Sequence, residues 1–118
     1  MKTILVAEDE ELLSQIYEDS LKNDFNVVVF HSGIEVLVYL EVNKPALAIL
    51  DVKLPDMSGL KLLEEIRKIL PDLPIILCTA YDTFRSDYEV WSAKISDYVV
   101  KPVALDELKR KIKKILGE

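Results

Sequence analysis

Acidic, hydroxyl and basic residues stand directly at the ends of the short apolar runs of this 118-residue chain. In chain order these residues are Glu8, Asp9, Asp51, Thr79 and Lys101. If the runs are parallel strands of one sheet, all five side chains reach its carboxyl edge. We expect an oxygen-rich pocket there with one ammonium and one hydroxyl group, which suits a hard divalent cation and a phosphoryl group.

The three carboxylates of this set predict a metal site. Carboxylates close together raise one another's pKa, and a bound divalent cation removes that conflict. We expect Asp9 and Asp51 to be direct ligands of Mg²⁺, with Mn²⁺ as the alternative ion. Glu8 has a longer side chain and is expected to act through water, and the backbone carbonyl of Lys53 would complete the site.

Asp51 is also a candidate nucleophile, because a carboxylate can attack a phosphoryl group and form an acyl phosphate. The metal and the Lys101 ammonium would then neutralise the oxygens of the transferred group. The Thr79 hydroxyl would donate a hydrogen bond to one of those oxygens.

Alternating strands and helices must position these residues. Nearly continuous Val, Ile and Leu runs predict strands covered on both faces, and they span 3–8, 26–30, 46–51, 74–79 and 97–100. Helical patterns lie between or after them, over 13–21, 34–42, 63–70, 83–93 and 105–116. This alternation predicts right-handed crossovers and an α/β, flavodoxin-like, doubly wound fold. Its parallel sheet has the order 2-1-3-4-5, with ligands where the first and third strands meet.

Two of these helices have ambiguous patterns. The segment 34–42 is rich in β-branched residues, but its place between two strands favours a crossover helix. The segment 83–93 has an aromatic stripe among many polar residues and is expected to be the least securely packed. Clearer signals are Ser58, a candidate cap of the third helix, and Gly117, a candidate stop for the last.

Length and composition predict one domain over 1–118, located in the cytoplasm. The net charge of −6, without a basic stretch before the last helix, argues against nucleic-acid binding. The apolar runs are too short to span a membrane, and Glu8 comes too early for a signal peptide. We expect Cys78 to be a buried thiol and His31 to lie on the surface.

In its motifs the whole chain resembles the receiver domain of two-component response regulators, of the chemotaxis-regulator kind. The matching segments are 6–10 (VAEDE), 50–59 (LDVKLPDMSG), 79–80 (TA) and 97–102 (DYVVKP). The resemblance implies that Asp51 accepts a phosphoryl group from a histidine kinase or a histidine phosphotransfer protein. It implies an acid pocket of Glu8 and Asp9, a phosphoryl-sensing Lys101, and a cis peptide bond between Lys101 and Pro102.

The same resemblance implies a switch. Thr79 and Tyr98 would act as a pair that reshapes the surface formed by 83–93, 97–100 and the last helix, which could support a phosphorylation-dependent homodimer. Three residues depart from the family pattern. Lys94 stands where Gly is frequent, Val103 where Phe is usual, and Tyr81 is large for a position near the phosphoryl site.

We therefore expect a phosphoacceptor that assists its own phosphorylation and dephosphorylation and is not otherwise an enzyme. One alternative is a Mg²⁺-dependent aspartyl phosphatase, but such enzymes commonly carry a second acid where this chain has Lys53. Another is an interaction module that keeps the fold and is never phosphorylated. The intact set of site residues argues against it.

Overall fold

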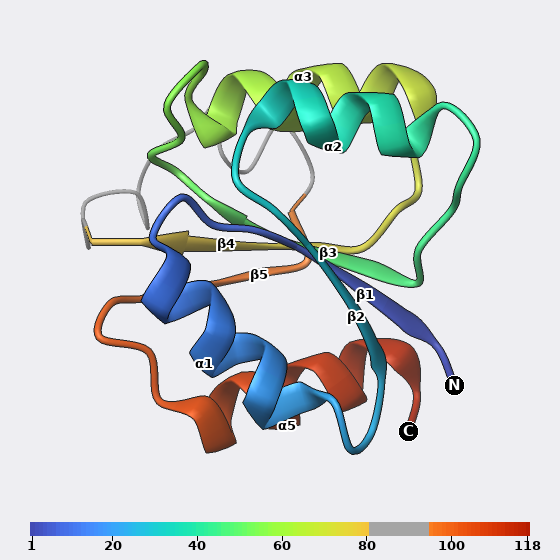
Figure 1. The fold of residues 1–118 in the computed structure, drawn as a ribbon. Coiled ribbons are helices and arrows are strands. Elements are labelled where there is room, and N and C mark those ends of the chain that lie inside the picture. The colour runs from blue at the N-terminus through green and yellow to red at the C-terminus, as the bar shows by residue number, and fades with distance from the viewer. Residues whose placement is uncertain (81–94) are drawn as a thin grey trace.

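The computed structural model describes residues 1–80 and 95–118, which form a parallel sheet with helices on both faces (Figure 1). The strands are β1 (Thr3–Ala7), β2 (Asn26–Phe30), β3 (Leu47–Asp51), β4 (Ile75–Thr79) and β5 (Asp97–Val100). The described helices are α1 (Glu11–Leu21), α2 (Gly33–Leu40), α3 (Gly59–Ile69) and α5 (Leu105–Leu116). All neighbouring strands pair in parallel in the order β2-β1-β3-β4-β5, which confirms the predicted flavodoxin-like topology.

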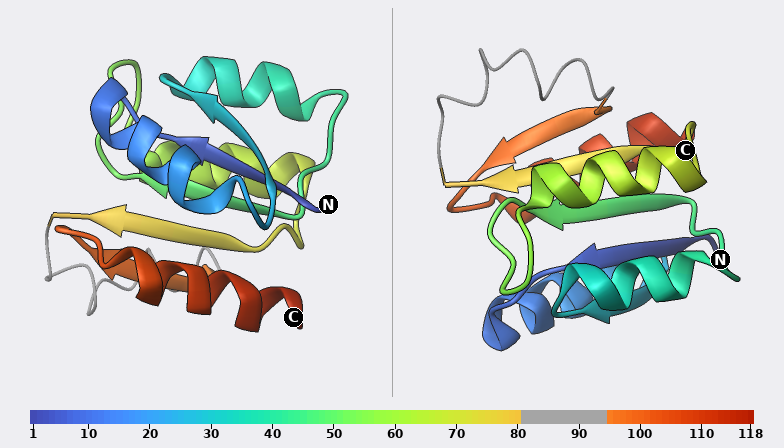
Figure 2. Two further views of the ribbon diagram at one scale, coloured as in Figure 1. Left: turned by 60° about the horizontal axis from the view of Figure 1, so that its bottom comes forward. Right: turned by 90° about the horizontal axis from the view of Figure 1, so that it is seen from above.

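The central strands are buried on both faces because, among the described helices, α2 and α3 cover one face and α1 and α5 the other (Figure 1). Side chains of a strand alternate between the two faces. In β1, Leu5 belongs to the core formed with α2 and α3, whereas Ile4 and Val6 belong to the core formed with α1 and α5. Figure 2 shows the two helix layers from other directions. This double covering explains why the strands read as continuous apolar runs.

The segment 34–42, which is rich in β-branched residues, was predicted to be a crossover helix because it lies between two strands. The structure confirms a helix there, α2. α2 begins after Ser32, whose side chain accepts a hydrogen bond from the backbone N–H of Glu35 at 3.3 Å. Val36 and Leu40 lie one turn apart and are buried against the sheet. Burial of this face outweighs the weak helix propensity of β-branched residues.

The predicted helix ends are confirmed at two positions. The Ser58 side chain accepts a hydrogen bond from the Lys61 N–H at 3.1 Å and so caps α3. Gly117 ends α5 in the left-handed region with φ of 74°. The predicted helix over 83–93, and the departures at Tyr81 and Lys94, lie outside the described residues.

Three further expectations can be compared with the structure. Cys78 is buried and His31 is exposed, as predicted. Val103, where the family usually has Phe, is half-buried and packs against the core formed with α1 and α5. Among the helices of 1–80 and 95–118, none combines the length and apolar character needed to cross a membrane.

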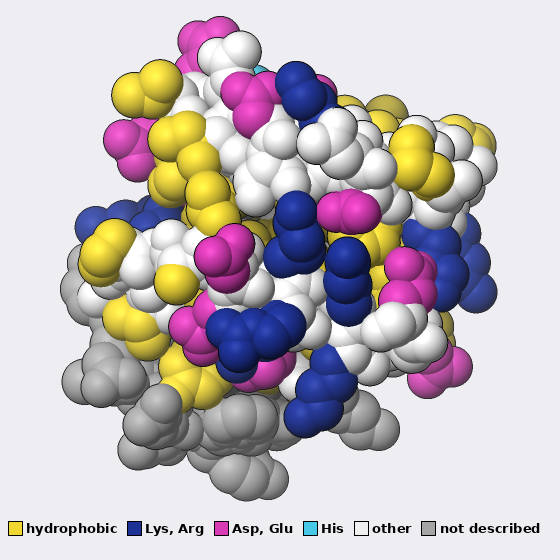
Figure 3. Space-filling model, turned by 90° about the horizontal axis from the view of Figure 1, so that it is seen from below, with side chains coloured by type: hydrophobic (Ala, Val, Ile, Leu, Met, Phe, Trp, Pro, Cys, Tyr) yellow, Lys and Arg dark blue, Asp and Glu magenta, His cyan; other side chains and the backbone are white. Residues whose placement is uncertain are grey.

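The face formed by α1 and α5 carries a concentration of Lys and Arg side chains, with Asp and Glu side chains among them (Figure 3). One link between the two helices is the ion pair of Lys109 on α5 with Asp24, just after α1, at 3.2 Å. The ends of the chain also meet on this side of the sheet, where the Lys2 ammonium donates to the Leu116 carbonyl at 3.1 Å.

Candidate functional site

The β1 strand delivers Glu8 to the carboxyl edge of the sheet, where its side chain is almost fully buried. Its backbone N–H donates to the carbonyl of Phe30 at 3.0 Å, which holds the residue beside the end of β2. Its Oε2 accepts a hydrogen bond from the Glu10 N–H at 3.1 Å. Burial raises the pKa of the Glu8 carboxyl, and the nearby carboxylate of Asp51 adds to that rise.

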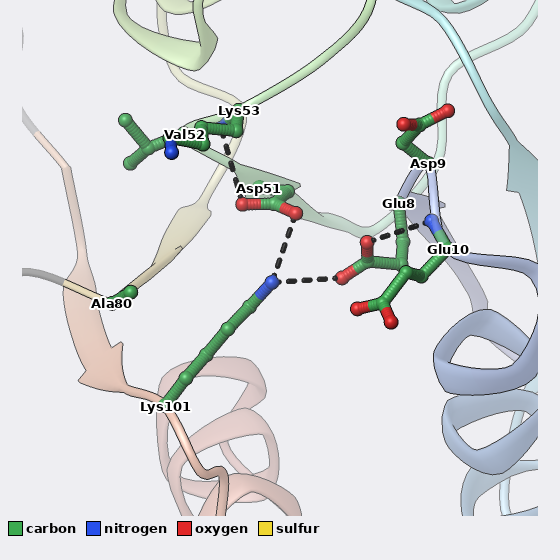
Figure 4. Close-up of a pocket in the computed structure, with 8 residues that line it drawn as sticks. All are labelled: Glu8, Asp9, Glu10, Asp51, Val52, Lys53, Ala80 and Lys101. Atoms are coloured by element: carbon green, nitrogen blue, oxygen red, sulfur yellow. Dashed lines mark hydrogen bonds and ion pairs between the residues drawn. The ribbon is translucent and has the colours of Figure 1, made fainter.

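Asp51 is the last residue of β3, and its carboxylate lies at the floor of the same pocket (Figure 4). The backbone N–H of Lys53 donates to Oδ1 at 3.1 Å, and the ammonium of Lys101 donates to Oδ2 at 2.9 Å. Both carboxylate oxygens therefore have a defined partner, and the residue is only 7% exposed. This orientation presents the carboxylate to the pocket rather than to the core.

Lys101 follows β5 and reaches back across the sheet edge toward the two acids. Its backbone N–H donates to the Thr79 carbonyl at 2.7 Å, and the Lys101–Pro102 peptide bond is cis, as predicted. Its ammonium contacts Asp51 Oδ2 at 2.9 Å and Glu8 Oε1 at 3.2 Å. Burial lowers the pKa of this ammonium, but the two carboxylates outweigh that effect and the net pKa is raised.

The remaining predicted site residues differ in their placement. Asp9 is exposed and lines the pocket, but its carboxylate points away from Asp51 and Lys101 (Figure 4). Thr79 is buried at the end of β4, and it is the next residue, Ala80, that lines the pocket. Tyr98 is half-buried on β5 and packs against the core formed with α2 and α3.

These residues enclose a pocket of about 180 Å³, open to solvent at the carboxyl edge of the sheet. It is lined by Glu8, Asp9, Glu10, Asp51, Val52, Lys53, Ala80 and Lys101. The sequence pattern assigned no role to Glu10, Val52 or Ala80. The signal that could have found them is that each directly follows a predicted site residue within a matching motif segment. Of these, Glu10 contacts a predicted site residue, because its N–H donates to the Glu8 carboxylate.

The pocket has the donor chemistry of a Mg²⁺ site, although its acids are not gathered around one point. Within 1–80 and 95–118, no three acidic, histidine or cysteine side chains are arranged to hold a metal ion. The residues predicted to supply the ligands, Asp9, Asp51 and Lys53, nevertheless line this one pocket. Carboxylate and carbonyl oxygens are the ligands that Mg²⁺ prefers, so the residues fit the ion.

The arrangement can support chemistry at Asp51. A carboxylate at the floor of an open pocket is accessible to a small electrophile, and the adjacent Lys101 ammonium can balance charge on an incoming anion. The pocket presents oxygen ligands but, among its eight lining residues, neither a hydroxyl nor an imidazole. The Asp51 carboxylate, which contacts Lys101, is therefore a candidate nucleophile of this pocket.

Comparison with known proteins gives concordant matches. The model of the response regulator receiver domain family matches residues 4–113. The chain is 32% identical over 115 residues to the probable transcriptional regulatory protein TcrX of Mycobacterium tuberculosis, covering 97% of this chain and 49% of that protein. The chain thus spans about half the length of the curated relatives it matches.

Solved structures are similar over nearly the whole chain. A CheY-like response regulator receiver domain protein of Methanospirillum hungatei superposes with a TM-score of 0.93 at 30% identity, covering 99% of this chain and 94% of that chain. The response regulator TrrA of Thermotoga maritima, determined in complex with Mg²⁺ and BeF, superposes with a TM-score of 0.88 at 39% identity. That match covers 98% of this chain and 99% of TrrA.

Proposed function

The chain belongs to the response regulator receiver domain family of two-component signal transduction, and from this premise we propose that Asp51 is its phosphoacceptor. The observation that carries the proposal is the Asp51 carboxylate at the pocket floor, with Lys101 Nζ 2.9 Å from its Oδ2. The phosphoryl donor would be a histidine kinase or a histidine phosphotransfer protein.

The proposed transfer starts with attack of an Asp51 carboxylate oxygen on the phosphorus of a phosphohistidine. A phosphorus–oxygen bond forms, and the phosphorus–nitrogen bond breaks. Its electron pair stays on the imidazole nitrogen of the donor, which then takes up a proton. The Lys101 ammonium already contacts Asp51 and is placed to pair with the oxygens of the arriving phosphoryl group.

Mg²⁺, or Mn²⁺ in its place, would be held by Asp9, Asp51 and the backbone carbonyl of Lys53, with Glu8 acting through water. When bound, the cation would offset the negative charge of the phosphoryl oxygens. Binding requires Asp9 to turn its carboxylate into the pocket, because it points away in this structure (Figure 4). Support comes from the oxygen-rich lining of the pocket and from TrrA, which was determined with Mg²⁺ and BeF.

We propose that residues 1–118 form a single receiver domain that works in the cytoplasm as a signalling phosphoacceptor. The family match to residues 4–113 and the single five-stranded sheet support one domain, and the buried free thiol of Cys78 suits a reducing compartment. Thr79 and Tyr98 would relay phosphorylation to the surface that contains β5 and α5. We further propose that phosphorylation allows two copies of the chain to form a homodimer through that surface.

The proposal is tested by incubating the chain with acetyl phosphate and Mg²⁺ and measuring its intact mass. The wild type should gain one phosphoryl group, and Asp51→Asn should gain none. Asp19→Asn is a suitable control, because Asp19 lies on α1 in an exposed ion pair with Lys22. Transfer from an autophosphorylated histidine kinase should show the same dependence on Asp51. An equal mass gain in Asp51→Asn would show that another residue is the acceptor.

A further inference from the structure

The loop between β3 and α3 carries Lys53 next to the pocket and folds back on itself. Lys53 and Ser58 form an antiparallel bridge, and the Gly59 N–H donates to the Val52 carbonyl at 2.7 Å. The base of the loop is therefore closed beside Asp51. The tip, which contains Asp56 and Met57, extends away from the sheet toward the start of α2.

Asp56 joins this tip to α2 through two hydrogen bonds. The backbone N–H of Gly33 donates to Oδ1 at 2.8 Å, and that of Ile34 donates to Oδ2 at 2.9 Å. Both N–H groups belong to the first turn of the helix, where no intrahelical acceptor exists. The positive end of the helix dipole also favours a carboxylate at this place. The N–H groups of Gly33 and Ile34 hold the pKa of Asp56 below its usual range.

Met57 adds an apolar contact to the same junction. A Cβ atom placed on Gly33 would lie 2.6 Å from both Cγ and Sδ of Met57, so the methionine side chain packs directly against Gly33 and would have to shift to admit a larger residue. Met57 also packs against the core formed with α2 and α3. The loop tip is thus fixed to α2 by a bidentate polar contact and by a close apolar contact next to it.

From this geometry we propose that Asp56 is a positioning residue for the phosphorylation site. By holding the loop tip on α2, it fixes the Lys53 peptide group, whose N–H donates to Asp51 Oδ1 at 3.1 Å. The carbonyl of the same residue is the proposed third protein ligand of Mg²⁺. The inference rests on the proposed function of Asp51, and it assigns to Asp56 a role that acts through Lys53.

A simple helix cap is the competing explanation, and the structure offers a matched control for it. Ser32 also caps α2, because its side chain accepts from the Glu35 N–H at 3.3 Å. Within the described part of the chain, the hydrogen bonds of the Ser32 side chain go to Glu35 and not to the β3–α3 loop. Ser32→Ala therefore removes a cap from the same helix end without releasing the loop. Asp56→Ala removes both the cap and the tether, and Asp56→Asn keeps one acceptor oxygen.

The first measurement uses the metal-free chain. In Asp56→Ala, the Lys53 amide resonance should shift and its hydrogen exchange should accelerate, because the loop is released from α2. Asp56→Asn should give an intermediate change. Ser32→Ala should lower the melting temperature but leave the Lys53 amide unchanged. If Asp56→Ala and Ser32→Ala lose similar stability and both leave the Lys53 amide as in the wild type, Asp56 is only a helix cap.

The second measurement is Mg²⁺ affinity by calorimetry, followed by the rate of phosphorylation by acetyl phosphate. We expect Asp56→Ala to lose roughly tenfold in Mg²⁺ affinity, the lower end of the loss typical for residues that orient metal ligands. Ser32→Ala should keep the wild-type affinity, and equal affinities in all three proteins would overturn the inference. The amide and affinity measurements need no phosphodonor, so a wild type that is not phosphorylated contradicts the proposed function alone.

Discussion

The ammonium nitrogen of Lys101 lies 2.9 Å from Oδ2 of Asp51, although 50 positions separate the two residues in the sequence. The same nitrogen lies 3.2 Å from Oε1 of Glu8. One cation thus stands between two carboxylates that are largely removed from solvent, where they would otherwise repel each other. Lys101 therefore stabilises the pocket in this structure, in addition to its proposed contact with the phosphoryl group.

Replacing Lys101 by Met should lower the free energy of unfolding at neutral pH by about 1–3 kcal/mol, because two buried acceptors lose their partner. Urea denaturation measures this change. Mg²⁺ should recover more stability in the variant than in the wild type, since a divalent cation restores the lost positive charge.

The matched control for Lys101→Met is Lys109→Met. Lys109 pairs with Asp24 at 3.2 Å, and both side chains are about one third exposed. Surface pairs of this kind contribute roughly 0–1 kcal/mol. Equal losses in the two variants would mean that Lys101 has no special effect on the acid pair.

Asp9→Asn should weaken Mg²⁺ binding while leaving the stability of the metal-free chain unchanged. The carboxylate is exposed and points away from Asp51 and Lys101, so its loss removes a proposed metal ligand but no contact with those two residues (Figure 4). Calorimetric titration with Mg²⁺ measures the affinity. Glu11→Gln, which removes a carboxylate outside the pocket, should bind Mg²⁺ like the wild type. The metal assignment is wrong if Asp9→Asn also retains that affinity.

Gly59→Ala should destabilise the chain and disturb the site, because α3 starts against the end of β3. A Cβ atom at Gly59 would lie 2.3 Å from the Asp51 carbonyl oxygen and 2.8 Å from the Val52 Cα, and neither backbone atom can turn away. Such overpacking typically costs about 1–3 kcal/mol, which urea denaturation can measure.

Gly117→Ala is the control for Gly59→Ala, because it introduces backbone strain without a steric clash. Gly117 has φ of 74°, yet among the described residues other than its chain neighbours no atom lies within 4 Å of an added Cβ. Its substitution should cost about 1 kcal/mol of strain and leave Mg²⁺ binding unchanged. Gly59→Ala, by contrast, should lower Mg²⁺ affinity, because it displaces the backbone of Asp51. Retained Mg²⁺ affinity in Gly59→Ala would contradict this coupling.

The free energy of unfolding should decrease in alkaline solution, and part of this decrease should come from ionisation of the Cys78 thiol. Burial raises the pKa of this thiol from 9.0 to about 12, although the Tyr17 hydroxyl, 4.0 Å from Sγ, partly opposes the rise. Between these pH values the folded chain holds the thiol proton more tightly than the unfolded chain does. The free energy of unfolding contributed by Cys78 therefore decreases as pH rises through this window, by at most about 1.4 kcal/mol per pH unit.

Urea denaturation of the wild type and Cys78→Ala at several pH values above about 8 tests this slope. Tyr17, whose pKa burial and the neighbouring Cys78 raise, remains in both proteins, so the difference between them reports the thiol together with its effect on Tyr17. We expect a shallower decline in Cys78→Ala, together with a loss at every pH from the cavity that the substitution leaves. If the free energy of unfolding decreases equally steeply with pH in both proteins, the Cys78 thiol does not contribute to the loss of stability in alkaline solution.

Much of the fold could be predicted from the sequence, because periodicity and chain order carry that information. Apolar runs indicated all five strands to within a residue or two at each end, and α2 was identified by its place between strands despite its β-branched residues. Capping by Ser58 and termination at Gly117 depend on local backbone chemistry, so they too were predictable. The parallel topology then placed Glu8 and Asp51 together at one edge of the sheet.

Only the tertiary structure decided where the side chains of that edge point. Lys101 lies between Glu8 and Asp51, whereas Asp9, which adjoins Glu8 in sequence, faces away. The link from Asp56 to the first turn of α2 spans 22–23 residues and has no periodic signal. Side-chain torsions and contacts between loops depend on packing and electrostatics across distant segments. Residue spacing along the chain therefore predicts which residues meet at the edge, and the folded structure determines which of them touch.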